Sequence, residues 1–306
     1  MGDYYANGKL LVSGEYLVLH GASALVLPLK VGQHMQVNTL GYEDEALIRW
    51  QANVLNEPWF SALIRIPEWE ILETSDEQVA IKLTRVLLEA GKMNQLLYAP
   101  AMSFDITTNT GFNLDWGFGS SSALVANIAQ WAMIDPFELH FRTSNGSGAD
   151  IAASISGGPV LYRLLKQKPL FCRVGFKPPF YRNLWLIYLG HKQDSSQCVN
   201  DFNDSIKVDL KHIDQIDKIT LEMTQAESLG AFMLLIREHE KIMSGLLGLK
   251  TIRELLFDDF TGEVKSLGAW GGDFIMAATD EDDDTVRDYF NKKGMQPVFS
   301  FDEIVL

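Results

Sequence analysis

The sequence has little cysteine and no long apolar run. Its two cysteines, Cys172 and Cys198, are too few for a disulfide framework in a chain of 306 residues, and this scarcity favours a reducing, cytoplasmic setting. Charged residues interrupt the apolar stretches, as Glu15 does between residues 10 and 29, so none reaches the roughly 18 apolar residues that a membrane helix needs. We therefore expect a protein without a membrane partner.

The sequence also lacks an excess of basic residues. It holds 26 Lys and Arg against 40 Asp and Glu, which gives a formal net charge of −14. A protein held on DNA or RNA mainly by neutralising phosphates needs the opposite balance, so nucleic acid is an unfavourable partner. The chain is 47% hydrophobic and long enough for about two globular domains.

Patterns in the first half predict strands, glycine turns and helices. Ser75 and Gln78 match the pattern of a capping box, and the apolar spacing that follows predicts a helix over residues 76–90 that Gly91 ends. Alternation predicts a strand over residues 103–109, then a glycine loop and a helix that starts near Ser122. Shorter extended segments are predicted at residues 10–12, 24–29 and 35–37.

The middle of the chain offers a helix start and a domain boundary. Asp135 and Pro136, followed by Glu138, predict a short helix that runs to about Arg142. Three prolines among residues 166–182 favour a boundary near residue 166, so we expect domains at residues 1–166 and 167–306. The second domain is predicted to hold strands at residues 184–189 and 273–278, a helical region at 213–249 and a helix near 285–293. This mixture is α+β rather than doubly wound.

The sharpest local feature is Gly-Phe-Gly-Ser-Ser-Ser-Ala at residues 117–123, directly before a helix. Two glycines let backbone N–H groups approach an anion closely, and a helix N-terminus adds donors and partial positive charge. The serines can donate to phosphate or bind Mg²⁺. A phosphate site and a serine-capped helix after a flexible loop both fit this pattern.

Other known motifs are each excluded by a single residue or an incomplete pattern. Neither Gly8-Lys9 nor Gly91-Lys92 completes a Walker A sequence. Ser122 occupies the third glycine position of a dinucleotide fingerprint, and Ala123 the last glycine position of a nucleophile elbow. The six histidines show no zinc-ligand spacing, so a structural zinc site is not expected.

Two further segments hold charged residues beside glycines. Lys9 starts a strand that leads to Glu15 in a glycine turn, although a single lysine is usually just solvated. Asp150 follows the small residues 146–149 at an expected helix start, where a capping aspartate is the simpler interpretation. Each segment alone leaves its function open.

Taken together, four segments in this order resemble the motifs of the GHMP kinases. They are residues 8–16, 117–123, 146–150 and 265–273, and they are most similar to the mevalonate and phosphomevalonate kinase branch. The resemblance implies an ATP- and Mg²⁺-dependent kinase with an N-terminal domain like ribosomal protein S5 domain 2 and a ferredoxin-like C-terminal domain. The active site is then expected between the domains.

The resemblance also implies roles for individual residues. Asp150 matches the catalytic aspartate, Lys9 the lysine near the transferred phosphoryl group, and Ser121 the magnesium-binding serine. Glu138 is the candidate for a second magnesium ligand. The residues expected to hold the ATP phosphates are Gly117, Phe118, Gly119, Ser120, Ser121 and Ser122, and those expected to shape the third glycine loop are Gly268, Gly271 and Gly272.

Some positions depart from the family pattern, and they leave the acceptor open. Trp270 replaces a usual glycine, Ser122 a usual alanine, and Ala149 a tyrosine of the phosphomevalonate kinase type. The leading hypothesis is phosphoryl transfer to mevalonate or phosphomevalonate, an anionic small-molecule alcohol, in isoprenoid precursor synthesis. The alternatives are a diphosphomevalonate decarboxylase-like enzyme and a catalytically inactive nucleotide-binding homologue. The sequence leaves the oligomeric state open, including a homodimer.

Overall fold

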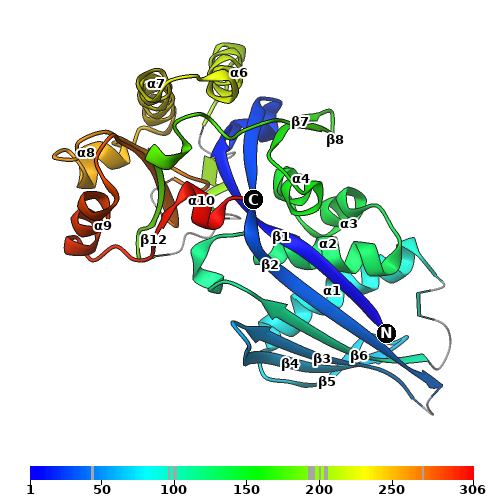
Figure 1. Ribbon diagram of the computed structural model, residues 1–306. Coiled ribbons are helices and arrows are strands. Elements are labelled where there is room, and N and C mark those ends of the chain that lie inside the picture. Colours follow the sequence, from blue (N-terminus) through cyan, green and yellow to red (C-terminus); the bar gives the residue numbers. More distant parts are fainter. Residues whose placement is uncertain are drawn as a thin grey trace. The chain divides into compact units, whose positions relative to one another are not determined.

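The structure of the chain is a computed structural model (Figure 1). It describes residues 1–42, 45–95, 97–98, 102–191, 197–199, 201–202, 206–270 and 272–306. The chain divides into two compact units, each with segments from several parts of the sequence. Unit 1 comprises Met1–Gly8, Val31–Leu114 and Phe118–Ile155, and unit 2 comprises Lys9–Lys30, Asp115–Gly117 and Ser156–Leu306.

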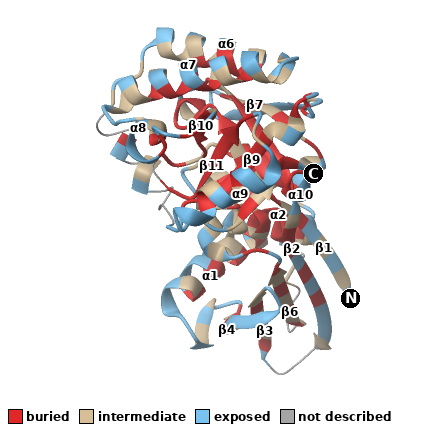
Figure 2. Ribbon diagram, turned by 60° about the vertical axis from the view of Figure 1, so that its left-hand side comes forward, coloured by how far each residue is buried: buried red, intermediate tan, exposed pale blue. Residues whose placement is uncertain are grey.

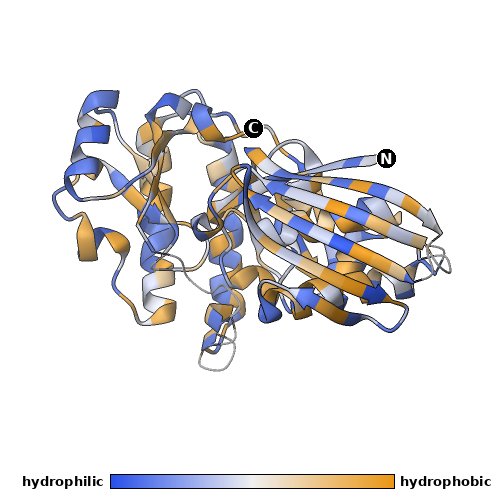
Figure 3. Cartoon of the chain, turned by 90° about the horizontal axis from the view of Figure 1, so that it is seen from below, coloured by the Kyte–Doolittle hydropathy of each residue, from blue (hydrophilic) through white to orange (hydrophobic). Residues whose placement is uncertain are grey.

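Unit 1 is built on a mixed sheet in the order β5-β4-β3-β6-β2, in which β3 and β6 run parallel. The strands are β1 (Gly2–Ser13), β2 (Ser23–Tyr42), β3 (Ala46–Val54), β4 (Glu57–Ile66), β5 (Glu70–Thr74) and β6 (Met102–Thr110). β1 pairs with β2, and both strands continue into unit 2. Hydropathy alternates along these strands (Figure 3), as in β3, where Ile48 and Trp50 are buried and Arg49 is partly exposed. One face of the sheet is therefore the core face.

Helices cover that core face (Figure 1). They are α1 (Glu77–Met93), α2 (Ser120–Ala132), α3 (Pro136–Thr143) and α4 (Ala149–Ser156). Trp131 of α2 meets Phe104 of β6 with ring centroids 5.3 Å apart. The side chain of Asp135 accepts hydrogen bonds from the first turn of α3, with Pro136 at the first helical position, so the predicted start of this helix is confirmed.

The predicted ends of α1 were wrong by a few residues. Asp76 caps the helix by accepting from the Val79 N–H, whereas the Ser75 hydroxyl accepts from the Ser61 N–H across the neighbouring strand end. The helix also passes through Gly91 to Met93. The Tyr98 ring fills the space beside Gly91, so this glycine serves close packing rather than termination.

Unit 2 holds an antiparallel sheet in the order β10-β11-β9-β12. Its strands are β9 (Leu184–Tyr188), β10 (Glu263–Ser266), β11 (Phe274–Ala278) and β12 (Val298–Ser300), and the helices of this unit are α6 (Leu210–Gln225), α7 (Leu229–Leu247), α8 (Ile252–Leu256), α9 (Asp283–Lys292) and α10 (Phe301–Ile304). Every residue of β9 and β11 is buried (Figure 2). The connectivity, a strand, helices, two strands, a helix and a strand, is ferredoxin-like, as expected.

The rest of unit 2 extends the pairing of β2. Ser23–Val26 of β2 pair with β7 (Val160–Leu165), which pairs with β8 (Lys168–Arg173). Residue 166 lies in the turn between β7 and β8, and the division of the chain at that residue stays a prediction. The single helical region predicted at residues 213–249 is two helices, because Ser228 caps α7 after a break at Ala226.

The two sheets with their helices confirm the α+β prediction. Asp282 accepts a hydrogen bond from the Thr285 N–H, so the acidic run before α9 begins a helix. No helix in the described part of the chain is both long and apolar enough to span a membrane.

Candidate active site

The glycine loop of residues 117–122 comprises the end of the connection between β6 and α2 and the first turn of α2, in the predicted order of strand, loop and helix. Gly117 and Gly119 have φ angles of 65° and 79°, which few residues other than glycine adopt at low cost. Gly119 is the N-cap of α2, and a glycine at this position brings no capping side chain to the helix start. The first turn also has no acidic residue, so its N–H groups and partial positive charge suit an anion.

The loop is anchored by the buried side chain of Phe118. Its ring centroid lies 5.6 Å from that of Phe112. A Cβ atom placed on Gly8 would come within 3.2 Å of the Phe118 carbonyl oxygen, so β1 passes close beneath the loop. Lys9 follows Gly8 directly in the chain. Phe118 can therefore offer only its backbone to a ligand, whereas the Ser121 side chain is exposed.

Inside unit 2, the start of the glycine loop touches Asp273. A Cβ atom on Gly117 would collide with the Oδ2 atom of Asp273. The Asp273 side chain is nearly buried, and its backbone is bonded on both sides, to His191 and to Leu189. Gly117 is thus required both for its positive φ and for the close approach of this carboxylate.

We expect the substitution Gly117→Ala to lower the free energy of unfolding by about 2–3 kcal/mol, of which about 1–2 is left-handed strain and the rest overpacking. Gly157→Ala is the matched control, because Gly157 has a φ of 63° and nothing within 4 Å of its added Cβ atom. The control should lose only the strain, about 1–2 kcal/mol. Urea unfolding measures both; equal losses would show that the approach of Asp273 does not matter.

The third glycine segment, residues 266–270, is tied to the strand and turn that precede it by about 250 residues. The Gly268 N–H donates to the Leu11 carbonyl at 3.3 Å, and the Trp270 N–H donates to the Tyr16 hydroxyl at 3.2 Å. The Trp270 ring is buried with Leu17 and Met243. Gly272 is buried, and Gly271 lies outside the described residues.

The two predicted catalytic residues lie in different elements. Lys9 is a half-buried residue of β1 in unit 2, and Asp150 is the second residue of α4 in unit 1. The Ser147 hydroxyl accepts from the Ala149 N–H at the start of α4. Asp150 therefore lies within the first helical turn and is not the cap that the simpler interpretation required.

His140 is a buried neighbour of Asp150 that the sequence analysis missed. It lies on α3, and a Cβ atom on Gly146 would come within 3.2 Å of its ring. Burial lowers the pKa of His140, while the Gly146 backbone and the charge of Asp150 act in the opposite direction. The spacing of the histidines can indicate a metal site, but it carries no signal for the approach of a single histidine to Asp150.

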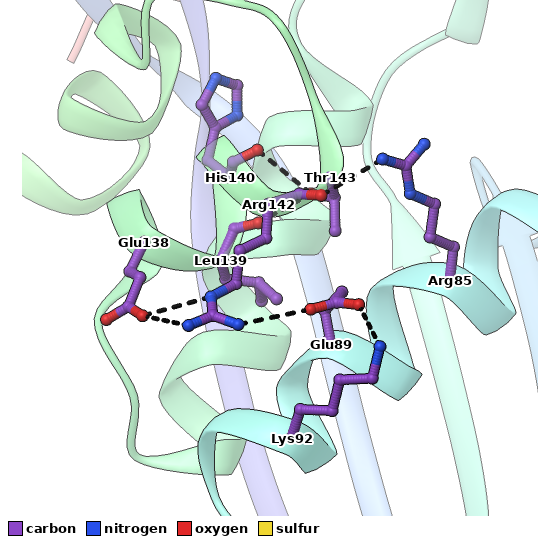
Figure 4. Close-up of polar contacts among 8 residues, drawn as sticks. All are labelled: Arg85, Glu89, Lys92, Glu138, Leu139, His140, Arg142 and Thr143. Atoms are coloured by element: carbon purple, nitrogen blue, oxygen red, sulfur yellow. Dashed lines mark hydrogen bonds and ion pairs between the residues drawn. The ribbon is translucent and has the colours of Figure 1, made fainter. Parts of the chain in front are cut away.

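Glu138 belongs to a network of ion pairs on the surface of unit 1 (Figure 4). Its carboxylate lies 2.7 Å from the Arg142 guanidinium, which is 3.6 Å from Glu89, and Glu89 pairs with Lys92. More than half of the Glu138 side chain is exposed. Its role as a magnesium ligand stays a prediction, and the described part of the chain has no group of three or more His, Cys, Asp or Glu side chains placed to hold a metal ion.

Unit 2 encloses a buried charge cluster made of Glu15, His239, Glu240 and Lys265. These four residues are at most 3% exposed. The Lys265 ammonium lies 2.5 Å from Glu15 and 3.8 Å from Glu240, and it also donates to the Ser266 carbonyl at 2.9 Å. His239 Nε2 lies 3.1 Å from the second oxygen of Glu15.

The protonation states of this cluster follow from burial and from Lys265. Burial alone would raise the pKa of Glu15, but Lys265 and His239 together lower it below its ordinary value. Burial and the charge of Lys265 lower the pKa of His239, so its imidazole is neutral at neutral pH. The cluster then holds one firm ion pair, Lys265 with Glu15, and neutral groups around it.

Comparison with solved structures gives matches along the whole chain. The phosphomevalonate kinase from Streptococcus pneumoniae, in complex with phosphomevalonate and AMPPNP, aligns with a TM-score of 0.73, 16% identity and coverage of 98% of this chain and 99% of that chain. The mevalonate kinase from Methanococcus jannaschii aligns with a TM-score of 0.68 and 15% identity, covering 97% and 96%. The chain has the GHMP kinase fold. The Lactococcus lactis galactokinase, complexed with galactose, also shares this fold, with a TM-score of 0.65, 11% identity and coverage of 97% and 91%.

Sequence comparison adds no closer relationship. No protein-family model and no curated protein matches the sequence. The TM-scores of 0.65–0.73 establish the GHMP kinase fold, whereas the identities of 11–16% leave the acceptor open. The described motif residues are divided between the two units. Asp150 belongs to unit 1, and Lys9 and residues 265–270 belong to unit 2. In the glycine loop, Gly117 is the last residue of a unit 2 segment and Phe118 the first residue of a unit 1 segment.

Proposed function

We propose that this chain is an ATP- and Mg²⁺-dependent kinase that transfers the γ-phosphoryl group to mevalonate or phosphomevalonate. The observation that carries the proposal is the start of α2, a helix N-terminus without a side-chain cap that follows a loop with two left-handed glycines. The fold is that of kinases of this kind, and one structural neighbour holds phosphomevalonate and an ATP analogue. Both facts support a small anionic alcohol as the acceptor.

The glycine loop and Lys9 would hold the phosphates. Backbone N–H groups of residues 118–122 would donate hydrogen bonds to the phosphates. Lys9 would add a positive charge from β1, where the residue before it, Gly8, lies against the loop. When bound, Mg²⁺ neutralises charge that spreads over the phosphoryl oxygens. The exposed Ser121 hydroxyl fits such an ion, because Mg²⁺ keeps several waters and phosphate oxygens and needs few protein ligands.

Asp150 would act on the acceptor. With mevalonate, its carboxylate orients the acceptor hydroxyl and takes its proton, while the hydroxyl oxygen forms a bond to the γ-phosphorus and the bond from that phosphorus to the β,γ-bridging oxygen breaks, so that this oxygen leaves with ADP. With phosphomevalonate, an ionised phosphate oxygen attacks the γ-phosphorus and no proton has to be taken, so Asp150 would act on that acceptor only by positioning it. We assign no step to Glu138, because its carboxylate pairs with Arg142.

A coupled assay of ADP release tests this function, with mevalonate and phosphomevalonate compared side by side and galactose as a control acceptor. We expect release with one of the two mevalonate compounds that exceeds the acceptor-free rate by a factor of about 100 or more, and no increase with galactose.

Three outcomes would contradict the proposal. Release of CO₂ with diphosphomevalonate would show a decarboxylase instead. ATP binding without product from either acceptor would show a nucleotide-binding protein that lacks this activity. Efficient turnover of galactose would place the acceptor in another class.

A further inference from the structure

The buried charge cluster lies at the base of the third glycine segment. α7 packs on β10 in unit 2 (Figure 2), and this contact places the Glu240 carboxyl group 3.8 Å from the Lys265 ammonium and near Ser266. Residues 265–270 are then held at three points: Lys265 on Glu15, Gly268 on Leu11, and the Trp270 backbone on Tyr16. Glu15 and Tyr16 belong to the glycine turn of the first motif segment, residues 8–16. The cluster therefore connects two of the four motif segments inside one unit.

The charges of the cluster are unbalanced unless one carboxyl group keeps its proton. One ammonium faces two carboxyl groups, and Glu15 is closer to it than Glu240 by 1.3 Å, the difference between 3.8 Å and 2.5 Å. A second buried carboxylate beside the first is costly, because two like charges share a site without water. Glu240 accordingly has the environment of a neutral acid.

We propose that Glu240 is a positioning residue, whose carboxyl group, buried between α7 and β10, fixes Lys265 and Ser266 and through them the backbone of the third glycine segment. The inference rests on the proposed kinase function, because it gives that segment a part in the phosphoryl transfer. Glu240 touches no reacting atom and acts only through Lys265 and Ser266.

The protonation of Glu240 makes this role dependent on pH. Burial raises the pKa of Glu240 to about 8; Lys265 opposes the shift and the charge of Glu15 adds to it. Above that pH a second carboxylate competes with Glu15 for Lys265. The other titratable or charged residues of α7 and β10 are the neutral His239, the exposed Glu238 and Lys241, and Arg237, which pairs with Glu263. Glu263 also pairs with Arg253 of α8.

The effect on stability has a definite sign. Because the folded chain holds the proton of Glu240 more tightly than the unfolded chain, the stability that this proton contributes is full below the ordinary pKa of a glutamate. That contribution is lost as the pH rises through about 8. An ionised Glu240 is then expected to loosen residues 265–270 before the rest of unit 2.

The pH dependence of kcat and of kcat/KM tests the proposal with three chains. In the wild type, kcat should fall about 10-fold between neutral pH and about pH 9, because a small displacement of a positioning segment costs rate more than binding. Glu240→Gln, which mimics the neutral acid, should keep the neutral rate and lose the alkaline decline. Glu238→Gln, an exposed neighbour on α7, should behave as the wild type. An unchanged decline in Glu240→Gln would overturn the proposal.

Two measurements on the chain without substrates separate this proposal from the kinase function. Infrared spectra of the wild type at neutral pH should show the C=O band of a protonated carboxylic acid that disappears on titration through about pH 8. Amide exchange in residues 265–270, corrected for its intrinsic pH dependence, should accelerate over the same interval in the wild type and not in Glu240→Gln. Absence of the band overturns the positioning role. Both signatures without turnover of any acceptor would instead overturn the kinase function.

Discussion

Asp150→Asn is expected to reduce kcat with mevalonate, a hydroxyl acceptor, by about 10²- to 10⁴-fold, the usual worth of a general base, while the affinity for an ATP analogue changes little. The asparagine keeps the size and hydrogen-bonding capacity of the side chain and loses only the ability to take a proton. The start of α4 should survive the substitution, because Ser147 accepts from the first N–H of this helix. Steady-state kinetics and calorimetric titration with the analogue measure the two quantities.

Asp135→Asn is the matched control for this variant. Asp135 is also an aspartate at a helix start in unit 1, but its carboxylate accepts from the N–H groups of Phe137 and Glu138, which makes it a cap. Asparagine caps helices about as well as aspartate, so kcat should stay within about 2-fold. If Asp150→Asn kept the wild-type rate, or if both variants lost rate equally, Asp150 would not be the base.

Lys265→Met is expected to lower the free energy of unfolding at neutral pH by about 3–5 kcal/mol, because it leaves the buried Glu15 carboxylate without its cation. Replacing both partners, as Glu15→Gln with Lys265→Met, should recover part of that loss, since no uncompensated charge remains. Urea unfolding of the two single variants and the double variant forms the complete cycle.

A surface ion pair provides the control for this cycle. Lys177 pairs with Asp302 at 2.9 Å, but its side chain is 62% exposed. Lys177→Met should therefore leave the urea midpoint nearly unchanged, because solvent screens an exposed ion pair. In the wild type, the ionised Glu15 carboxylate contributes to the free energy of unfolding fully above the ordinary pKa of a glutamate. That contribution is lost as the pH falls through the lowered pKa of Glu15 in the folded chain. A loss for Lys265→Met as small as that for Lys177→Met would mean that the buried pair does not stabilise unit 2.

Local signals in the sequence were enough to predict the parts of the fold that depend on neighbouring residues. Asp135 and Pro136 marked the start of α3, and glycine and serine marked the loop before α2. The start of α2 was placed near Ser122, whereas the helix begins at Ser120 with Gly119 as its cap. The spacing of apolar residues does not reveal that a glycine with a positive φ acts as the N-cap. The sequence therefore holds no indication that the helix begins two residues earlier than predicted.

The buried charge cluster was beyond sequence reasoning for a different reason. Glu15 and Lys265 are separated by 250 residues, and only the packing of unit 2 brings them together. Both residues stood inside the recognised motifs, yet a motif does not say which of its side chains is buried. His239 and Glu240 fall in the predicted helical region of residues 213–249, and helical spacing does not say which polar side chains of a helix are buried.

The central claim is that a nucleotide's phosphates bind at the start of α2, and a crystal structure with an ATP analogue and Mg²⁺ tests it most directly. The account predicts phosphate oxygens on the backbone N–H groups of residues 118–122, with Lys9 and Ser121 within contact distance of the phosphates or the ion. An analogue bound elsewhere, with the N–H groups at the start of α2 facing only water, would contradict it.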